Sequence, residues 1–332
     1  MTTILNYTNC KKIFESTNTL VYRGLRKSDN HSVILKMLKK NYPSPEKLTH
    51  YRQEFDITRD LENIDGVINT YGLEKYHNTL VIILEDFGGK SLDKLMAASI
   101  PPFGKGLGGI SISEFLPLAI QITDILGQIH AANVIHKDIN PSNIVYNPET
   151  KQLKIIDFGI ATVLPRENPT LKNPNQLEGT LAYISPEQTG RMNRALDYRT
   201  DFYSLGVTFY QLLTQRLPFE NKYAMELVHC HLAKQPTLPH LSNPYIPPVI
   251  SNIIIKLLAK TAESRYQSAH GLKSDIQECK ANLARIFTLG QQDFSDKLQL
   301  PQKLYGREPE IETLLTAFAR ANQGQSEMML VA

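Results

Sequence analysis

Apolar residues change their spacing from that of strands to that of helices about 90 residues into the chain. Segments 32–38 and 79–84 are rich in branched residues, which favours β-strands. The polar segment between them, from about Pro45 to Leu61, predicts a helix with one apolar face formed by Phe55, Ile57 and Leu61. From about Ser113 onward the helical spacing dominates. A small strand-rich part before a larger helical part predicts an α+β protein with two lobes.

Composition and charge exclude several classes of protein. The 332 residues are 42% hydrophobic and 21% charged, and the net charge of +3 is no signature of nucleic-acid binding. The three cysteines lack metal-ligand spacing and give no disulfide framework, so we expect a cytoplasmic protein. No basic-then-apolar leader and no apolar run near the roughly 18 residues of a membrane span occurs. We therefore expect no signal peptide and no membrane span in this chain.

Two acidic motifs in the helical part carry the chemistry of phosphoryl transfer. Asp138 is followed five residues later by Asn143, and Asp157 ends the strand-like run 153–156. Phosphoryl transfer needs a carboxylate that orients the attacking hydroxyl and hard oxygen ligands for Mg²⁺. We predict that Asp138 is the catalytic base and that Asn143 and Asp157 are Mg²⁺ ligands.

A lysine in the strand-rich part completes the set. Lys36 ends the β-branched run 33–36, and Glu54 lies on the predicted helix that follows. Either residue alone is more typical of a solvated surface. With the two acidic motifs, they predict that Lys36 holds the phosphates of ATP and that Glu54 fixes Lys36 by an ion pair.

The ordered motifs resemble the eukaryotic-type protein kinase family over about 270 residues. The resemblance rests on Val33-Ile34-Leu35-Lys36, Glu54, His136-Lys137-Asp138 with Asn143, Asp157-Phe158-Gly159, Gly179-Thr180, Ser185-Pro186-Glu187, Asp201 to Gly206, and Arg265. It implies a bilobal kinase-like fold over residues 7–283. A small antiparallel-sheet lobe with one key helix would cover about residues 7–87, and a larger helical lobe about residues 88–283.

The resemblance also implies roles for residues around the motifs. Backbone groups of Glu85 and Phe87 would bind the adenine edge of ATP. His136, Asp201 and a Glu187–Arg265 ion pair would be structural. Residues 157–187 would form an activation segment that receives a protein substrate, with Thr180 favouring Ser/Thr over Tyr. Thr170 is the most plausible phosphorylation site in that segment.

The phosphate-covering loop departs from the family pattern. Counting back from Val21 places Phe14, Ser16 and Thr19 where three glycines are usual. Glycine lets the backbone approach phosphate closely. We expect the hydroxyls of Ser16 and Thr19, together with Val21, to contact the nucleotide under a stiffer lid.

Three further departures concern single side chains. Ile34 stands where alanine usually faces the adenine ring, and Asn140 replaces the catalytic-loop lysine. Lys137 replaces the arginine that reads an activation-loop phosphate, and lysine cannot make the same planar bidentate contact. We therefore expect weak dependence on loop phosphorylation. The departures leave open a pseudokinase that binds nucleotide or acts as a scaffold, and a small-molecule kinase as a third alternative.

The C-terminal part predicts a second domain that the chain does not complete. Residues 284–303 read as a linker, and 304–332 resemble the start of an AAA-type ATPase module that stops before its phosphate-binding loop. An ordinary terminal helix and strand is the alternative. The combination resembles large bacterial hybrid sensors, in which ATPase and histidine-kinase modules follow the kinase domain. The chain would then be a fragment or a naturally shortened relative.

Overall fold

The computed structural model describes residues 2–4, 6–40, 42–98, 110–163, 179–192, 196–283 and 287–294, with positions 312, 313, 316, 317 and 320. The chain divides into two compact units, Met1–Phe294 and Ser295–Ala332, and every element below belongs to the first. Most of the predicted ATPase-like segment, residues 304–332, lies outside the described residues. Thr170 also lies outside them. The parts of the chain that the structure describes contain no helix with the length and apolar content of a membrane span.

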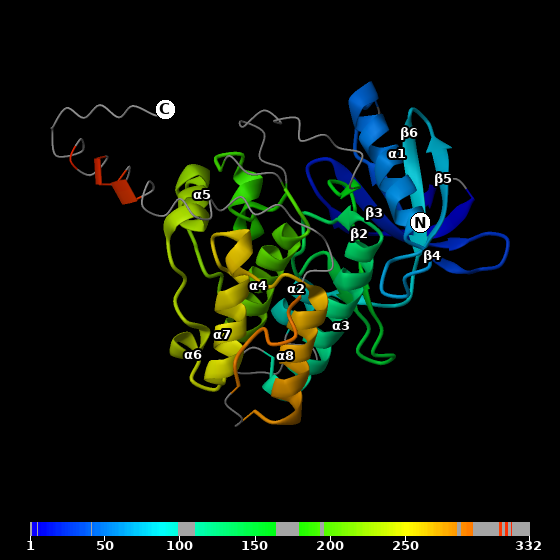
Figure 1. Ribbon diagram of the computed structural model, residues 1–332. Helices are drawn as coiled ribbons and strands as arrows, with labels where there is room; N and C mark the ends of the chain where they lie inside the picture. Colours follow the sequence, from blue (N-terminus) through cyan, green and yellow to red (C-terminus); the bar gives the residue numbers. More distant parts are fainter. Residues whose placement is uncertain are drawn as a thin grey trace. The chain divides into compact units, whose positions relative to one another are not determined.

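The N-terminal lobe is one antiparallel six-stranded sheet with strand order β1-β2-β3-β4-β6-β5 (Figure 1). Its strands are β1 (Thr2–Ile4), β2 (Tyr7–Glu15), β3 (Thr19–Arg26), β4 (Ser32–Leu38), β5 (Thr70–Tyr76) and β6 (Thr79–Glu85). Alternate side chains of β4 and β6, including Leu35 and Ile83, form the lobe's own apolar cluster. Lys36 lies between two members of that cluster and therefore projects from the opposite face of the sheet.

Helix α1 (Pro45–Asp60) is the one helix of this lobe among the described residues. Ser44 caps it by accepting a hydrogen bond from the Lys47 N–H, and Pro45 occupies its first position. The prediction for Phe55 was wrong: its ring is only half-buried and lies 5.4 Å from the Arg59 guanidinium. Phe55 and Ile57 are two residues apart and so cannot share a helix face.

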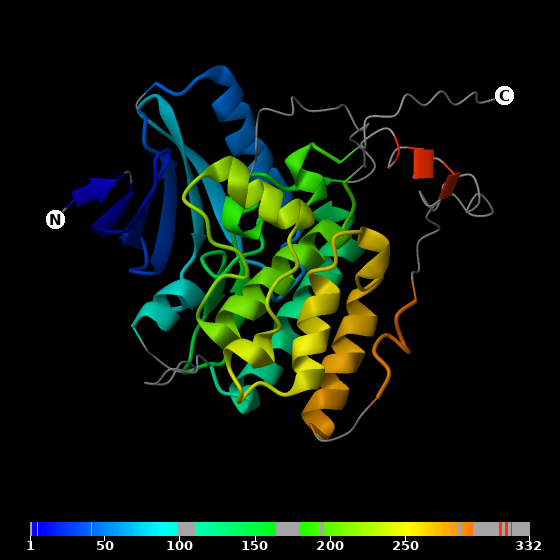
Figure 2. The ribbon, with the colours of Figure 1, turned by 90° about the vertical axis from the view of Figure 1, so that its left-hand side faces the viewer.

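The C-terminal lobe is mainly helical (Figure 2). Its helices are α2 (Leu92–Ala97), α3 (Ile112–Ala131), α4 (Arg199–Thr214), α5 (Ala224–Ala233), α6 (Pro239–Ser242), α7 (Pro248–Leu257) and α8 (Ala269–Ala281). Helix α4 is buried along almost its whole length, and α3 packs beside α8 (Figures 1 and 2). The α+β bilobal fold predicted from the sequence is confirmed.

Short strands and 3₁₀ helices position the loops of the C-terminal lobe. They are β7 (Lys90–Ser91), β8 (Val134–Ile135), β9 (Ile144–Tyr146), β10 (Leu153–Ile155), β11 (Thr162–Val163), η1 (Leu181–Tyr183), η2 (Glu187–Thr189) and η3 (Ala262–Ser264). Strand β9 pairs with β7 and β10, and β8 pairs with β11. These pairings fix the loop that follows β8 beside the loop that follows β10, and both loops carry predicted site residues.

Residues 287–294, which lie within the predicted linker, pack against the C-terminal lobe. Phe287 and Leu289 contact its apolar core. The Asp293 carboxylate accepts hydrogen bonds from the Gln267 and Ser268 N–H groups and from Ser268 Oγ, at 2.9 to 3.0 Å. The segment therefore closes the N-terminal end of α8.

Candidate active site

Lys36 forms ion pairs with two carboxylates that come from different elements of the fold. Its Nζ lies 2.5 Å from Glu54 Oε1 and 2.9 Å from Asp157 Oδ1. Lys36 comes from β4, Glu54 from α1, and Asp157 from the loop after β10. Tyr51, one turn before Glu54 on α1, donates its hydroxyl to the Lys36 carbonyl oxygen. The structure thus brings together three residues that are up to 121 positions apart.

The pKa values of Lys36, Glu54 and Asp157 are shifted by burial and by the ion pairs between them. Burial lowers the pKa of Lys36, but the Asp157 and Glu54 carboxylates outweigh it and leave that pKa raised. Burial raises the pKa of Asp157, but Lys36 outweighs it and leaves that pKa lowered. Burial also raises the pKa of Glu54, and Lys36 opposes that rise. Lys36 and Asp157 are therefore both held in their charged forms near neutral pH.

Asp138 lies in the loop between β8 and β9, and both of its oxygens are oriented by hydrogen bonds. Oδ1 accepts one from the Thr180 N–H at 2.9 Å, and Oδ2 accepts one from Asn143 Nδ2 at 2.9 Å. Asn140 Nδ2 donates to the Asp138 carbonyl oxygen at 3.0 Å and contacts Thr180 Oγ1 at 3.4 Å. At the position where the family usually has lysine, Asn140 therefore makes an uncharged contact to Thr180. Nothing in the sequence indicates this contact.

Asp201 of helix α4 fixes the backbone just before Asp138. The Asp201 carboxylate accepts the His136 N–H at 2.9 Å and the Lys137 N–H at 2.7 Å. Lys137 has a φ of 66°, a left-handed conformation that costs energy for a residue other than glycine. His136 is fully buried, as predicted for a structural residue, with its ring against Phe158 at 4.8 Å. These contacts hold the loop before Asp138 in a strained conformation.

The backbone around Asp157 is equally constrained. Asp157 has a φ of 67°, and Phe158 is buried. A Cβ at Gly159 would lie 3.1 Å from Asp157 Oδ1, which is a tight contact, and 3.5 Å from Glu54 Oε2, which is an ordinary van der Waals contact. The Gly159 N–H donates to Asp157 Oδ1 at 3.3 Å. Glycine at this position therefore leaves the Asp157 carboxylate room that a side chain would reduce.

The predicted lid is the turn between β2 and β3. Ser16 Oγ accepts hydrogen bonds from the Asn18 and Thr19 N–H groups at 3.3 and 3.0 Å, and the Ser16 N–H donates to the Thr19 carbonyl oxygen. Val21 pairs in register with Lys36 on β4. The serine oxygen therefore stabilises the turn by accepting both bonds, and these bonds do not use the O–H with which the predicted contact to a nucleotide would be made.

The predicted adenine-binding residues lie in the hinge, which we define as residues 85–88 between the two lobes. The Glu85 N–H donates to the Asn69 carbonyl oxygen at 3.0 Å. The Phe87 carbonyl oxygen accepts a hydrogen bond from Asn147 Nδ2 at 2.8 Å. These contacts favour the Glu85 carbonyl and the Phe87 N–H as the backbone groups for a ligand.

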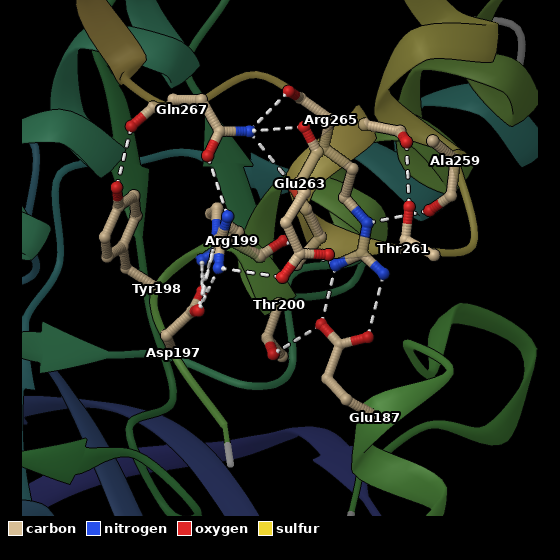
Figure 3. Close-up of polar contacts among 12 residues, drawn as sticks. Glu187, Asp197, Tyr198, Arg199, Thr200, Ala259, Thr261, Glu263, Arg265 and Gln267 are labelled. Atoms are coloured by element: carbon tan, nitrogen blue, oxygen red, sulfur yellow. Dashed lines mark hydrogen bonds and ion pairs between the residues drawn. The ribbon is translucent and has the colours of Figure 1, made fainter. Parts of the chain in front are cut away.

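A buried ion pair fixes the far end of the segment that follows the site. Arg265 contacts both oxygens of Glu187, at 2.6 and 2.8 Å, and Thr200 Oγ1 donates to Glu187 Oε1 at 2.9 Å (Figure 3). The Arg265 guanidinium also donates to the carbonyl oxygens of Arg199 and Ala259. The pair predicted from the sequence is present, and these partners of both side chains belong to the C-terminal lobe.

Comparisons with known proteins agree with this geometry. A family model for the protein kinase domain matches residues 7–276. The hybrid signal transduction histidine kinase G of Dictyostelium discoideum is 31% identical over 69% of this chain and 9% of its own length. The serine/threonine-protein kinase PrkC of Bacillus subtilis is 28% identical over 75% of this chain and 36% of its own length. The serine/threonine-protein kinase pkn3 of Myxococcus xanthus is 29% identical over 77% of this chain and 47% of its own length.

The chain spans less than half the length of each of these relatives. The family match, however, covers most of the chain and includes every residue of the candidate site. With the bilobal fold and the Lys36–Glu54–Asp157 arrangement, it shows that this chain belongs to the protein kinase domain family.

Proposed function

We propose that this chain transfers the γ-phosphate of ATP to serine or threonine residues of proteins. The observation that carries the proposal is the contact of Lys36 with both Glu54 and Asp157, beside a loop in which Asp138 is oriented by Thr180 and Asn143. A scaffold that had lost catalysis would have no chemical need for this whole set of oriented charges.

The residues divide the work of phosphoryl transfer between them. Lys36, fixed by Glu54, holds the phosphates of ATP, and Asp138 orients the hydroxyl of the protein substrate. Asn143 and Asp157 hold Mg²⁺. The donor set fits that ion because Asp157 is kept ionised and its side chain is 43% exposed, while Asn143 uses its amide nitrogen on Asp138 and so directs its oxygen elsewhere. Mg²⁺ neutralises the charge that develops on the phosphates.

Two observations support serine and threonine as acceptors. The Thr180 N–H donates to Asp138, so a residue of the predicted activation segment lies beside the proposed base. PrkC and pkn3 carry the name serine/threonine-protein kinase. Asn140, in place of a lysine, gives the site one positive charge fewer, so we expect slower transfer than in kinases with that lysine.

We further propose that the kinase domain, residues 7–283, is the front part of a larger signalling protein. Residues 284–303 would connect it to an ATPase-like module that begins at about residue 304, with a histidine-kinase module beyond. The similarity to a hybrid histidine kinase that is many times longer than this chain supports this arrangement.

The test is phosphate incorporation from Mg·ATP labelled at the γ-phosphate into a general protein substrate, followed by acid hydrolysis and identification of the labelled amino acid. We expect label on serine or threonine with the wild type and none with Asp157→Asn. Asp56→Asn, a control at an exposed carboxylate on α1, should retain incorporation. Label on tyrosine alone, or equal incorporation by Asp157→Asn, would contradict the proposal.

A further inference from the structure

Three polar side chains meet behind the hinge, away from the Lys36–Asp157 contact. Glu85 Oε2 lies 2.9 Å from Lys154 Nζ and accepts a hydrogen bond from Asn69 Nδ2 at 3.0 Å. Lys154 Nζ also donates to the Val67 carbonyl oxygen at 3.1 Å. We call Asn69, Glu85 and Lys154 the hinge clasp. Each member comes from a different part of the fold: the loop before β5, the start of the hinge, and strand β10.

Backbone contacts hold the same three segments together. The Glu85 N–H donates to the Asn69 carbonyl oxygen at 3.0 Å. The Ile155 N–H donates to the Gly66 carbonyl oxygen at 2.8 Å, and the Ile68 N–H donates back to the Ile155 carbonyl oxygen at 3.2 Å. The loop 66–69 of the N-terminal lobe is therefore attached both to the hinge and to strand β10 of the C-terminal lobe.

Breaking the hinge clasp should cost free energy, because its charged groups are shielded from water. The Lys154 side chain is 6% exposed and the Glu85 side chain 19%. Removing one partner of such a pair leaves the other charge without compensation in a poorly solvated place. A buried ion pair contributes little net stability compared with apolar side chains of similar size, so its distinctive contribution here is a fixed geometry.

That geometry connects the two ends of the nucleotide cleft. Glu85 belongs to the hinge, and Lys154 lies three residues before Asp157 on the strand that leads to it. We propose that the hinge clasp sets the position of the hinge relative to Asp157, and that Lys154 and Asn69 are positioning residues for nucleotide binding. This inference rests on the proposed function, because it assumes that ATP spans the cleft from the hinge to Asp157.

The test compares Lys154→Met, Glu85→Gln, their double variant and Lys154→Arg with wild type. Lys154→Met should raise the KM for ATP about tenfold while kcat changes by less than about threefold, because a small displacement of the hinge weakens binding along the whole nucleotide. The double variant should lose much less than the product of the two single losses, since both remove the same contact. Lys154→Arg, which retains the charge, should restore most of the affinity. Lys75→Met, at an exposed lysine on β5, is the matched control.

Two readouts separate failure of this inference from failure of the proposed function. Mg·ATP affinity by calorimetry tests the clasp even if the wild type transfers no phosphate. Amide hydrogen exchange at Glu85 and Ile155 in the free protein needs no nucleotide, and Lys154→Met should accelerate it locally. The inference is overturned if Lys154→Met behaves as Lys75→Met does, if the single losses multiply, or if only stability falls with the KM for ATP unchanged.

Discussion

The Glu187 carboxylate shows how one side chain depends on its partner. Burial raises its pKa, but Arg265 outweighs burial and leaves the pKa below its ordinary value of 4.5. A carboxylate with a lowered pKa stabilises the fold above its unfolded pKa, and this stability is lost as the pH falls through the folded pKa. The ion pair should therefore contribute fully at neutral pH and progressively less in acid.

We predict that Glu187→Gln lowers the free energy of unfolding by about 3–5 kcal/mol at pH 7, because it leaves the Arg265 charge buried without its partner. Urea denaturation at a series of pH values measures this. The difference from wild type should be constant above about pH 5 and should narrow below it. Glu220→Gln, at an exposed glutamate, should cost less than about 0.5 kcal/mol. If the difference in free energy of unfolding between wild type and Glu187→Gln widens in acid, the pKa of Glu187 is not lowered in the folded protein.

The sequence singles out residues that carry motif chemistry, and it gives no sign of residues that matter only through their contacts. Lys36, Asp138 and Asp157 belong to residue types and spacings that phosphoryl transfer requires. Lys154 and Asn69 have no such pattern, and their separation along the chain gives no periodicity that would predict their contact with Glu85. Their role emerges only when strand β10 and the hinge are placed in space.

At the scale of elements, local sequence determines where the long helix α3 begins. Ser111 Oγ accepts the Glu114 N–H at 3.3 Å, which caps the helix, and donates to Glu114 Oε2 at 2.6 Å. We predict that Ser111→Ala lowers the free energy of unfolding by about 1 kcal/mol. Urea denaturation checks this against Ser28→Ala, a control at an exposed serine in the turn between β3 and β4. Equal stability of the two variants would show that the cap contributes nothing.

Whether a segment forms a helix or a strand was predictable where the spacing of apolar residues was clear. Which side chains lie on the buried face of a helix was not. The strands around 32–38 and 79–84 and the helix from about Pro45 to Leu61 appear as β4, β6 and α1. Phe55 was assigned to the wrong face because apolar character was given more weight than the angle between neighbouring positions on a helix. The predicted lid residues Ser16 and Thr19 lie at the turn between β2 and β3, and the hydrogen bonds of Ser16 there depend on turn geometry that composition does not specify.

For the molecule as a whole, residues 287–294 behave as part of the C-terminal lobe, although the family match ends at residue 276. The Asp293 side chain is 5% exposed and accepts hydrogen bonds at the start of α8. We predict that Asp293→Ala lowers the free energy of unfolding by about 1–3 kcal/mol, because Gln267 and Ser268 lose a buried acceptor. Thermal or urea denaturation beside Gln292→Ala, an exposed control, measures this. Identical midpoints would mean that the segment adds no stability.

The central claim is that both lobes together form a site that transfers phosphate and does not merely bind nucleotide. The most direct measurement compares Mg·ATP affinity and single-turnover transfer in wild type and Asp138→Asn. Asparagine retains an oxygen for the Thr180 N–H but is no longer a carboxylate. We predict nearly unchanged affinity and a transfer rate about 10²–10⁴ lower in the variant. Binding without transfer in the wild type, or equal transfer by both proteins, would contradict the account.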